Sequence, residues 1–126
     1  MIDTEKLTEL RNIFAEAVKK AKGNIGFVDI EPNDNRPDNA TTAQNEVSDA
    51  LYHCQQIYSS SGTVLARTEY DADTKSQASL FAKMSDEWKQ EAEPYKQSNN
   101  RDIFDFVEKA EAILDYVASS AEAGPQ

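Results

Sequence analysis

The sequence predicts an all-α fold, a four-helix bundle or a close variant, in a single domain that spans residues 1–126. Apolar residues recur at three- and four-residue steps in four separate segments, which is typical of helices that bury one face. The length is sufficient for one hydrophobic core, and no internal repeat or domain boundary interrupts the chain. The polar composition, with aromatic residues spaced singly, suits a small helical protein with wide solvated faces.

The segment over residues 102–121 has the strongest pattern, and we expect the core to be built around it. Its apolar face comprises Ile103, Phe106, Val107, Ala110, Ile113, Leu114, Val117 and Ala121. Its opposite face carries a line of carboxylates, comprising Asp105, Glu108, Glu111, Asp115 and Glu122. Asp102 is predicted to cap this helix, and residues 120–126 are predicted to form a frayed polar tail.

A first helix is predicted to begin at Asp3 or Thr4 and to run to about Lys22. Its apolar face comprises Leu7, Leu10, Phe14, Ala17, Val18 and Ala21. Acidic residues near its start and lysines near its end both complement the helix macrodipole. Gly23 is expected to end the helix in a left-handed conformation.

Residues 24–40 are predicted to form one long irregular connection. Pro32 and Pro37 lie among Asn and Asp residues without a helical period, which indicates an extended loop. The apolar patch over residues 25–30 is expected to lie against the bundle as an extended segment or a short strand.

A second helix is predicted to begin near Thr41 or Thr42 and to end at the small residues 59–62. Its apolar face comprises Ala43, Val47, Ala50, Leu51, Cys54, Ile57 and Tyr58.

Residues 63–70 fit either a strand or a helical lead-in, and a break is expected near Asp71 or Asp73. A third helix would then begin with Asp73 as its N-cap and end at Pro94. Its apolar face comprises Leu80, Phe81, Met84, Trp88 and Ala92. Aromatic and Met residues at this spacing are interpreted as core and not as a ligand pocket.

Thirteen Lys and Arg against 23 Asp and Glu give the chain a formal net charge of -10. We expect no direct binding to nucleic acid, because contact with phosphates requires basic side chains that replace counterions. Anionic membrane surfaces are disfavoured for the same reason. The charge instead favours a basic protein partner, which it would attract over a distance.

Cys54 is the only cysteine, so no intrachain disulfide and no cysteine zinc site is expected. No apolar run approaches the roughly 20 residues that span a membrane, and the N-terminus has no apolar signal core. These features predict a soluble, reduced, cytoplasmic protein that binds no membrane and needs no cofactor. They leave homo-oligomerisation open.

Glu46, Asp49 and His53 are the first candidates for chemistry, because their spacing places them on one flank of the second helix. Two carboxylates and an imidazole can bind a divalent metal or act as acid and base. A helical metal site normally takes ligands from a second helix, to which Glu87 and Glu91 of the third helix could contribute. A solvated flank is the simpler interpretation, so no metal site is predicted.

Cys54 follows His53 directly, but adjacent helical residues point about 100° apart and do not form a catalytic pair. The position of Cys54 within the apolar face predicts a buried, inert thiol. The chain contains no glycine-rich phosphate loop and no Gly-x-Ser-x-Gly elbow. An enzyme is therefore not predicted.

The acidic side of the last helix is the predicted partner-binding surface. Two aromatic residues lie among its carboxylates, giving the set Phe104, Asp105, Glu108, Glu111, Asp115 and Tyr116. Aromatic residues beside carboxylates suit a basic, partly apolar partner. The alternative is that Phe104 packs beneath the preceding linker and that the carboxylates are only solvated.

These observations favour a non-enzymatic, acidic protein-binding module of the small inhibitor, immunity or adaptor type. A DNA-mimicking decoy is an alternative, in which carboxylates imitate phosphates, although the interspersed Lys and Arg argue against it. A metal-dependent all-α hydrolase that uses Glu46, Asp49 and His53 is the third hypothesis.

Overall fold

A computed structural model of the chain describes residues 2–24, 42–69 and 75–122. It contains four helices, α1 (Thr4–Asn24), α2 (Thr42–Glu69), α3 (Lys75–Lys96) and α4 (Arg101–Glu122). Within the described residues there is no strand, so the all-α four-helix prediction is confirmed. The irregular connection predicted over residues 24–40, with its short strand, lies almost wholly outside the described residues. The break expected near Asp71 or Asp73 also lies outside them. The same holds for the side chains of Ala43, Ala121 and Glu122.

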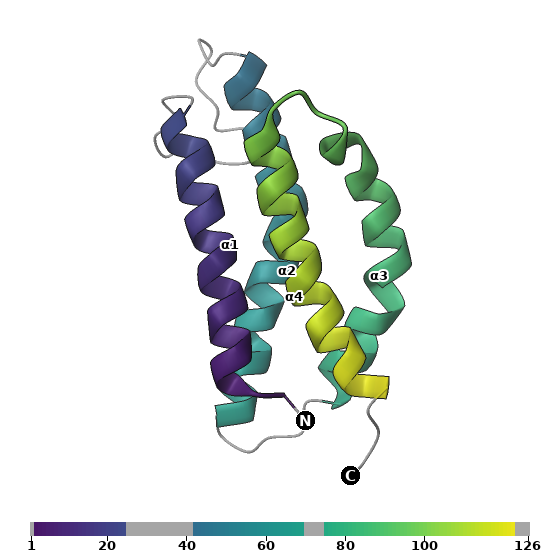
Figure 1. Cartoon of the computed structure of the whole chain (residues 1–126). Helices are drawn as coiled ribbons and strands as arrows, with labels where there is room; N and C mark the ends of the chain where they lie inside the picture. The colour runs from purple at the N-terminus through teal and green to yellow at the C-terminus, as the bar shows by residue number, and fades with distance from the viewer. Residues whose placement is uncertain (1, 25–41, 70–74, 123–126) are drawn as a thin grey trace.

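The four helices run alternately up and down, so each is antiparallel to the next along the chain (Figure 1). α4 contacts all three of the other helices, and among the pairs of helices that touch, α2 and α3 make the least contact. The described residues of the apolar face predicted for α4 are each at most 1% exposed: Ile103, Phe106, Val107, Ala110, Ile113, Leu114 and Val117. The prediction that the core is built around this helix is confirmed.

Helix α1 meets both α4 and α2 through aromatic side chains. Phe14 of α1 contacts Phe106 edge-on, with ring centroids 6.4 Å apart, and lies 5.3 Å from the ring of Tyr58 on α2. On α3, Phe81 and Trp88 are buried as predicted.

Leu80, which was predicted to face the core, is instead 55% exposed. Ala78 takes the inward position of that turn, and Leu80 follows it by two residues, or about 200° around the helix. Leu80 therefore lies on the solvent side of α3.

The start of α1 matches the prediction, but its end does not. The Asp3 carboxylate oxygen Oδ1 accepts hydrogen bonds from the backbone N–H groups of Glu5 at 3.0 Å and Lys6 at 3.4 Å, as an N-cap does. Gly23 lies inside the helix without a left-handed backbone, so its predicted role as the stop is wrong. The helix continues to Asn24, whose Nδ2 donates to the Asp102 carboxylate at 2.7 Å.

The cap of α4 is Asn100 and not Asp102, as the sequence had suggested. The side-chain Oδ1 of Asn100 accepts the N–H of Asp102 at 2.9 Å, and its carbonyl accepts the N–H of Ile103 at 3.1 Å. Asp102 lies in the first turn, where a carboxylate also complements the positive end of the helix dipole. Residues 120–122, assigned to the tail from sequence, are helical.

The predicted end of α2 at residues 59–62 is wrong, because the helix continues to Glu69. Ser61 is fully buried, and its hydroxyl donates to the Tyr58 carbonyl at 2.7 Å. The Arg11 guanidinium donates to the same hydroxyl at 2.6 Å and also to the Tyr58 carbonyl. A Cβ on Gly62 would lie only 3.2 Å from that guanidinium. The packing of the Arg11 guanidinium of α1 against this part of α2 explains why small residues lie inside a continuous helix.

Residues 63–69 are accordingly helical and not a strand. Val64 is fully buried, and Thr68 donates from its hydroxyl to the Val64 carbonyl at 2.9 Å. Donation to the carbonyl four residues earlier is compatible with a helix, so the β-branched side chains do not interrupt it.

Pro94 also lies inside its helix instead of ending it, since α3 continues to Lys96. The N–H of Gln97 still donates to the Glu93 carbonyl at 3.2 Å, and that of Ser98 donates to Tyr95 at 3.2 Å. Proline removes one backbone donor close to the end of α3, where few helical hydrogen bonds remain to be lost.

None of the four described helices is long and apolar enough to cross a membrane.

Candidate functional site

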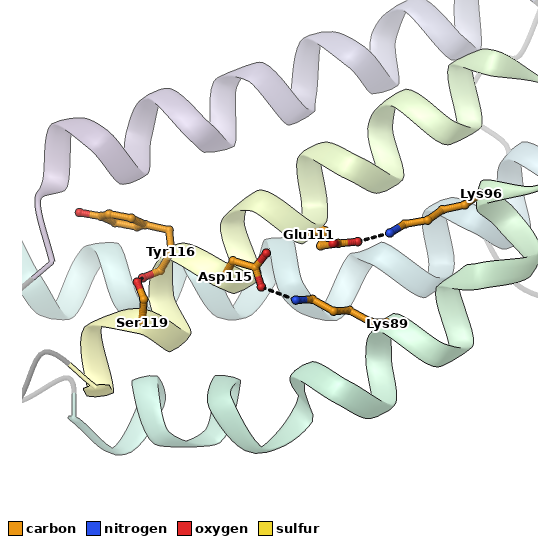
Figure 2. Close-up of polar contacts among 6 residues, drawn as sticks. All are labelled: Lys89, Lys96, Glu111, Asp115, Tyr116 and Ser119. Carbon is orange, nitrogen blue, oxygen red and sulfur yellow. Dashed lines mark hydrogen bonds and ion pairs between the residues drawn. The ribbon is translucent and has the colours of Figure 1, made fainter.

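The predicted partner-binding residues of α4 divide between two sides of the helix (Figure 2). Asp115 and Glu111 point toward α3, where Lys89 Nζ lies 2.7 Å from Asp115 Oδ1 and Lys96 pairs with Glu111. The hydrogen bond to Asp115 is the main cause that raises the pKa of Lys89. Two of the predicted carboxylates, Glu111 and Asp115, are therefore already paired with lysines of α3.

Tyr116 points the other way, toward α1 (Figure 2). Its hydroxyl oxygen accepts the backbone N–H of Asp3 at 2.9 Å, and its ring is half-buried against the core. This hydroxyl connects the start of the first helix to the end of the last one. Tyr116 therefore has a structural role that the sequence pattern did not indicate.

Of the other three residues of the predicted surface, Phe104 and Glu108 are exposed and Asp105 is half-buried. Phe104 is 41% exposed, so the hypothesis that it lies on the surface is compatible with the fold. Glu108 is exposed, and Asp105 forms an i,i+4 ion pair with Lys109 at 3.4 Å. These residues form the outer face of α4.

An open groove of about 830 Å³ runs between α1 and α4. Ile13, 40% exposed, and Ala17 contribute its apolar part. Carboxylates surround them, supplied by Glu5, Glu9 and Glu16 of α1 and Asp105 of α4. Two cations, Lys20 and Lys109, also line the groove. The sequence analysis missed this feature, although an isoleucine outside the apolar stripe of α1 was a signal for it.

Among the described residues, no metal-binding cluster includes His53. Its ring stacks on Trp88 with centroids 4.8 Å apart, and its Nε2 lies 3.3 Å from the Trp88 carbonyl oxygen. Burial lowers the pKa of His53, although the Trp88 carbonyl and the charge of Glu91 oppose this shift. The imidazole is therefore neutral near pH 7.

The described residues contain no group of three or more His, Cys, Asp or Glu placed to hold a metal ion. Glu46 instead accepts a hydrogen bond from the Ser98 hydroxyl at 3.3 Å. The candidate residues Glu46, Asp49 and His53 are thus not assembled as one set of ligands among the described residues.

A second pocket, of about 430 Å³, lies in the α2–α3 seam where these helices make little contact. Tyr52, His53, Trp88 and Tyr95 bring aromatic rings to it, and Asp49 and Glu91 are among its other lining residues. Sequence reasoning interpreted Trp88 as core and not as part of a ligand pocket, and it expected the third helix to end before Tyr95. Tyr52 lies outside the apolar stripe of α2, and this was the available signal for the pocket.

Cys54 is fully buried, which confirms the interpretation of a core thiol. Burial raises its pKa to about 12, so the thiolate fraction at about pH 8 is on the order of 10⁻⁴.

We expect a colorimetric thiol reagent to leave the native protein unmodified and to label it fully in guanidinium chloride. Fast labelling of the native protein at neutral pH would contradict the buried position.

Comparison of this chain with protein-family models, with curated proteins and with solved structures finds no match in any of the three.

Proposed function

We propose that this protein is a non-enzymatic, acidic protein-binding module that engages a basic partner through the surface formed by α1 and α4. The observation that supports this proposal is the groove between these helices, in which exposed Ile13 lies among carboxylates of Glu5, Glu9 and Glu16. An apolar contact inside a charged rim is the usual composition of a protein interface. The net charge of -10 agrees with a basic partner.

The apolar and the charged residues of this surface have different tasks in the proposal. Ile13 and Phe104 supply the side chains that a partner would desolvate, which mainly determines how slowly it dissociates. The carboxylates mainly raise the association rate, since their attraction acts before contact. Glu111 and Asp115 contribute less, because Lys96 and Lys89 already neutralise part of their charge.

The other two hypotheses gain no specific support. A DNA-mimicking decoy needs rows of accessible carboxylates, yet Asp105, Glu111 and Asp115 each pair with a lysine. A metal-dependent hydrolase needs a ligand set, and none is assembled among the described residues.

Site-specific photocrosslinking at position 13 tests the proposal. A benzophenone amino acid replaces Ile13, the partner is captured from an extract of the source cells, and the purified partner is then titrated against variants. Ile13→Ser should weaken binding roughly 5- to 30-fold, the loss expected for an apolar anchor of about 1–2 kcal/mol. Leu80→Ser is the matched control, because Leu80 is also apolar and exposed but lies on α3 and does not line the groove.

The charge contribution is tested with the double variant Glu9→Gln, Glu16→Gln. We expect a lower association rate at low salt and a smaller difference at high salt, where screening already removes the attraction. If Ile13→Ser and Leu80→Ser bind the captured partner with equal affinity, the groove is not the binding surface. A partner whose association rate ignores both salt and the two carboxylates would contradict the electrostatic part.

A further inference from the structure

The pocket between α2 and α3 combines aromatic rings with carboxylates and has a fixed frame. Trp88 Nε1 donates to the His53 carbonyl at 3.1 Å, while His53 Nε2 lies 3.3 Å from the Trp88 carbonyl oxygen. These reciprocal contacts hold the two helices together at a seam that otherwise has few. The Tyr95 ring lies 5.3 Å from the His53 ring, which extends the aromatic wall.

The electrostatic environment of this pocket is negative. Asp49 and Glu91 both line the pocket together with Tyr95. Burial raises the pKa of Tyr95, and the nearby charges of these two carboxylates raise it further. His53 adds no positive charge near pH 7, because burial lowers its pKa. None of the residues described as lining the pocket is Lys or Arg. A cation that entered would meet no repelling charge from the lining.

We propose that this pocket binds a small organic cation, namely an alkylammonium ion held by aromatic rings and by the charges of Asp49 and Glu91. The rings of Tyr and Trp attract a cation through their quadrupole, and aromatic pockets use this attraction to hold quaternary ammonium groups. The volume of about 430 Å³ lies in the range of small-molecule sites, roughly 300–1,000 Å³. The described residues hold no group of three metal-ligating side chains here, which favours a diffuse organic cation over a bare metal ion, because a metal ion needs convergent ligands.

This inference is independent of the proposed partner-binding groove. The two pockets share no lining residue, and they lie between different pairs of helices. One can therefore be correct while the other is wrong.

Titration with choline chloride tests the inference on the intact chain. Trp88 is the only tryptophan, so its fluorescence and its indole NMR signal report on this pocket alone. We expect a saturable change in both signals with choline. Sodium chloride at matched ionic strength, and 3,3-dimethylbutan-1-ol, the uncharged carbon analogue of choline, should give no saturable change.

Variants of exposed lining residues separate ligand binding from folding. Tyr52, at 62% exposed, can be replaced without opening the core, and Tyr52→Ala should weaken choline binding roughly two- to fivefold while Tyr52→Phe retains it. Glu91→Gln should weaken binding, whereas Glu87→Gln, an exposed carboxylate one turn away on α3 that does not line the pocket, should leave it unchanged.

Three results would overturn the inference. The first is the absence of a saturable response to choline in both signals. The second is an equal response to the uncharged analogue, which would indicate apolar contact alone. The third is unchanged affinity in both Tyr52→Ala and Glu91→Gln.

Discussion

Leu114→Ala is expected to lower the free energy of unfolding by about 2–5 kcal/mol, as large-to-small substitutions in a core do. Leu114 is fully buried on α4, the helix that contacts all three others. Removing its side chain leaves a cavity between several helices, which cannot all move inward to fill it. Urea denaturation followed by circular dichroism measures the loss, with the slope against denaturant expected to stay unchanged.

Glu108→Ala is the matched control for this prediction, since Glu108 is exposed on the same helix. Its effect should stay within about 0.5 kcal/mol. Glu111 is a poorer control, because it pairs with Lys96 and only 23% of its side chain is exposed. Comparable losses at positions 108 and 114 would mean that the buried face of α4 is misassigned.

The buried faces of the helices were predictable because they depend on local spacing alone. Seven of the eight apolar positions predicted for α4 are described and buried, and Leu7, Phe14, Ala17 and Ala21 are buried on α1. The N-cap at Asp3 was predictable for the same reason, since its hydrogen bonds reach only two and three residues along the chain. Spacing and local chemistry thus predicted most of the buried positions, with Leu80 on α3 as an exception.

The helix ends were predicted less well because residues that tend to break helices were interpreted without knowledge of their tertiary contacts. Gly62 lies beneath the Arg11 guanidinium, a residue 51 positions earlier, and Ser61 is satisfied by the same group. Pro94 is tolerated because it falls within the last turn of α3. A sequence pattern shows the local propensity to stop a helix, but not the tertiary contact that outweighs it.

The candidate sites were predictable only as far as one helix carries them. The period of α4 placed its carboxylates and Phe104 on one side. However, three of the predicted residues are bound by Lys89, Lys96 and Asp3, which lie outside α4. The α2–α3 pocket depends on Tyr52 and Tyr95, which are 43 residues apart. Only the packing of the helices determines which of these groups meet.

Val64→Asp is expected to destabilise the protein strongly, by about 3–5 kcal/mol, because it leaves an unpaired charge in the core. Val64 is fully buried in the part of α2 that follows Gly62, where a sequence pattern suggested a strand or a separate lead-in. Burying a carboxylate there also raises its pKa, so part of the penalty should disappear at low pH as the side chain becomes neutral.

Thr63→Asp provides the matched control, because Thr63 is the adjacent residue and is exposed on the same helix. The new side chain is identical and the helix propensity is similar, so only burial differs between the two variants. We expect Thr63→Asp to change the free energy of unfolding by less than about 1 kcal/mol. A helix that ended at Gly62 would leave both positions in a solvated segment, and the two variants would then lose similar, small amounts of stability. A large difference between neighbouring positions requires that α2 continues and directs Val64 into the core.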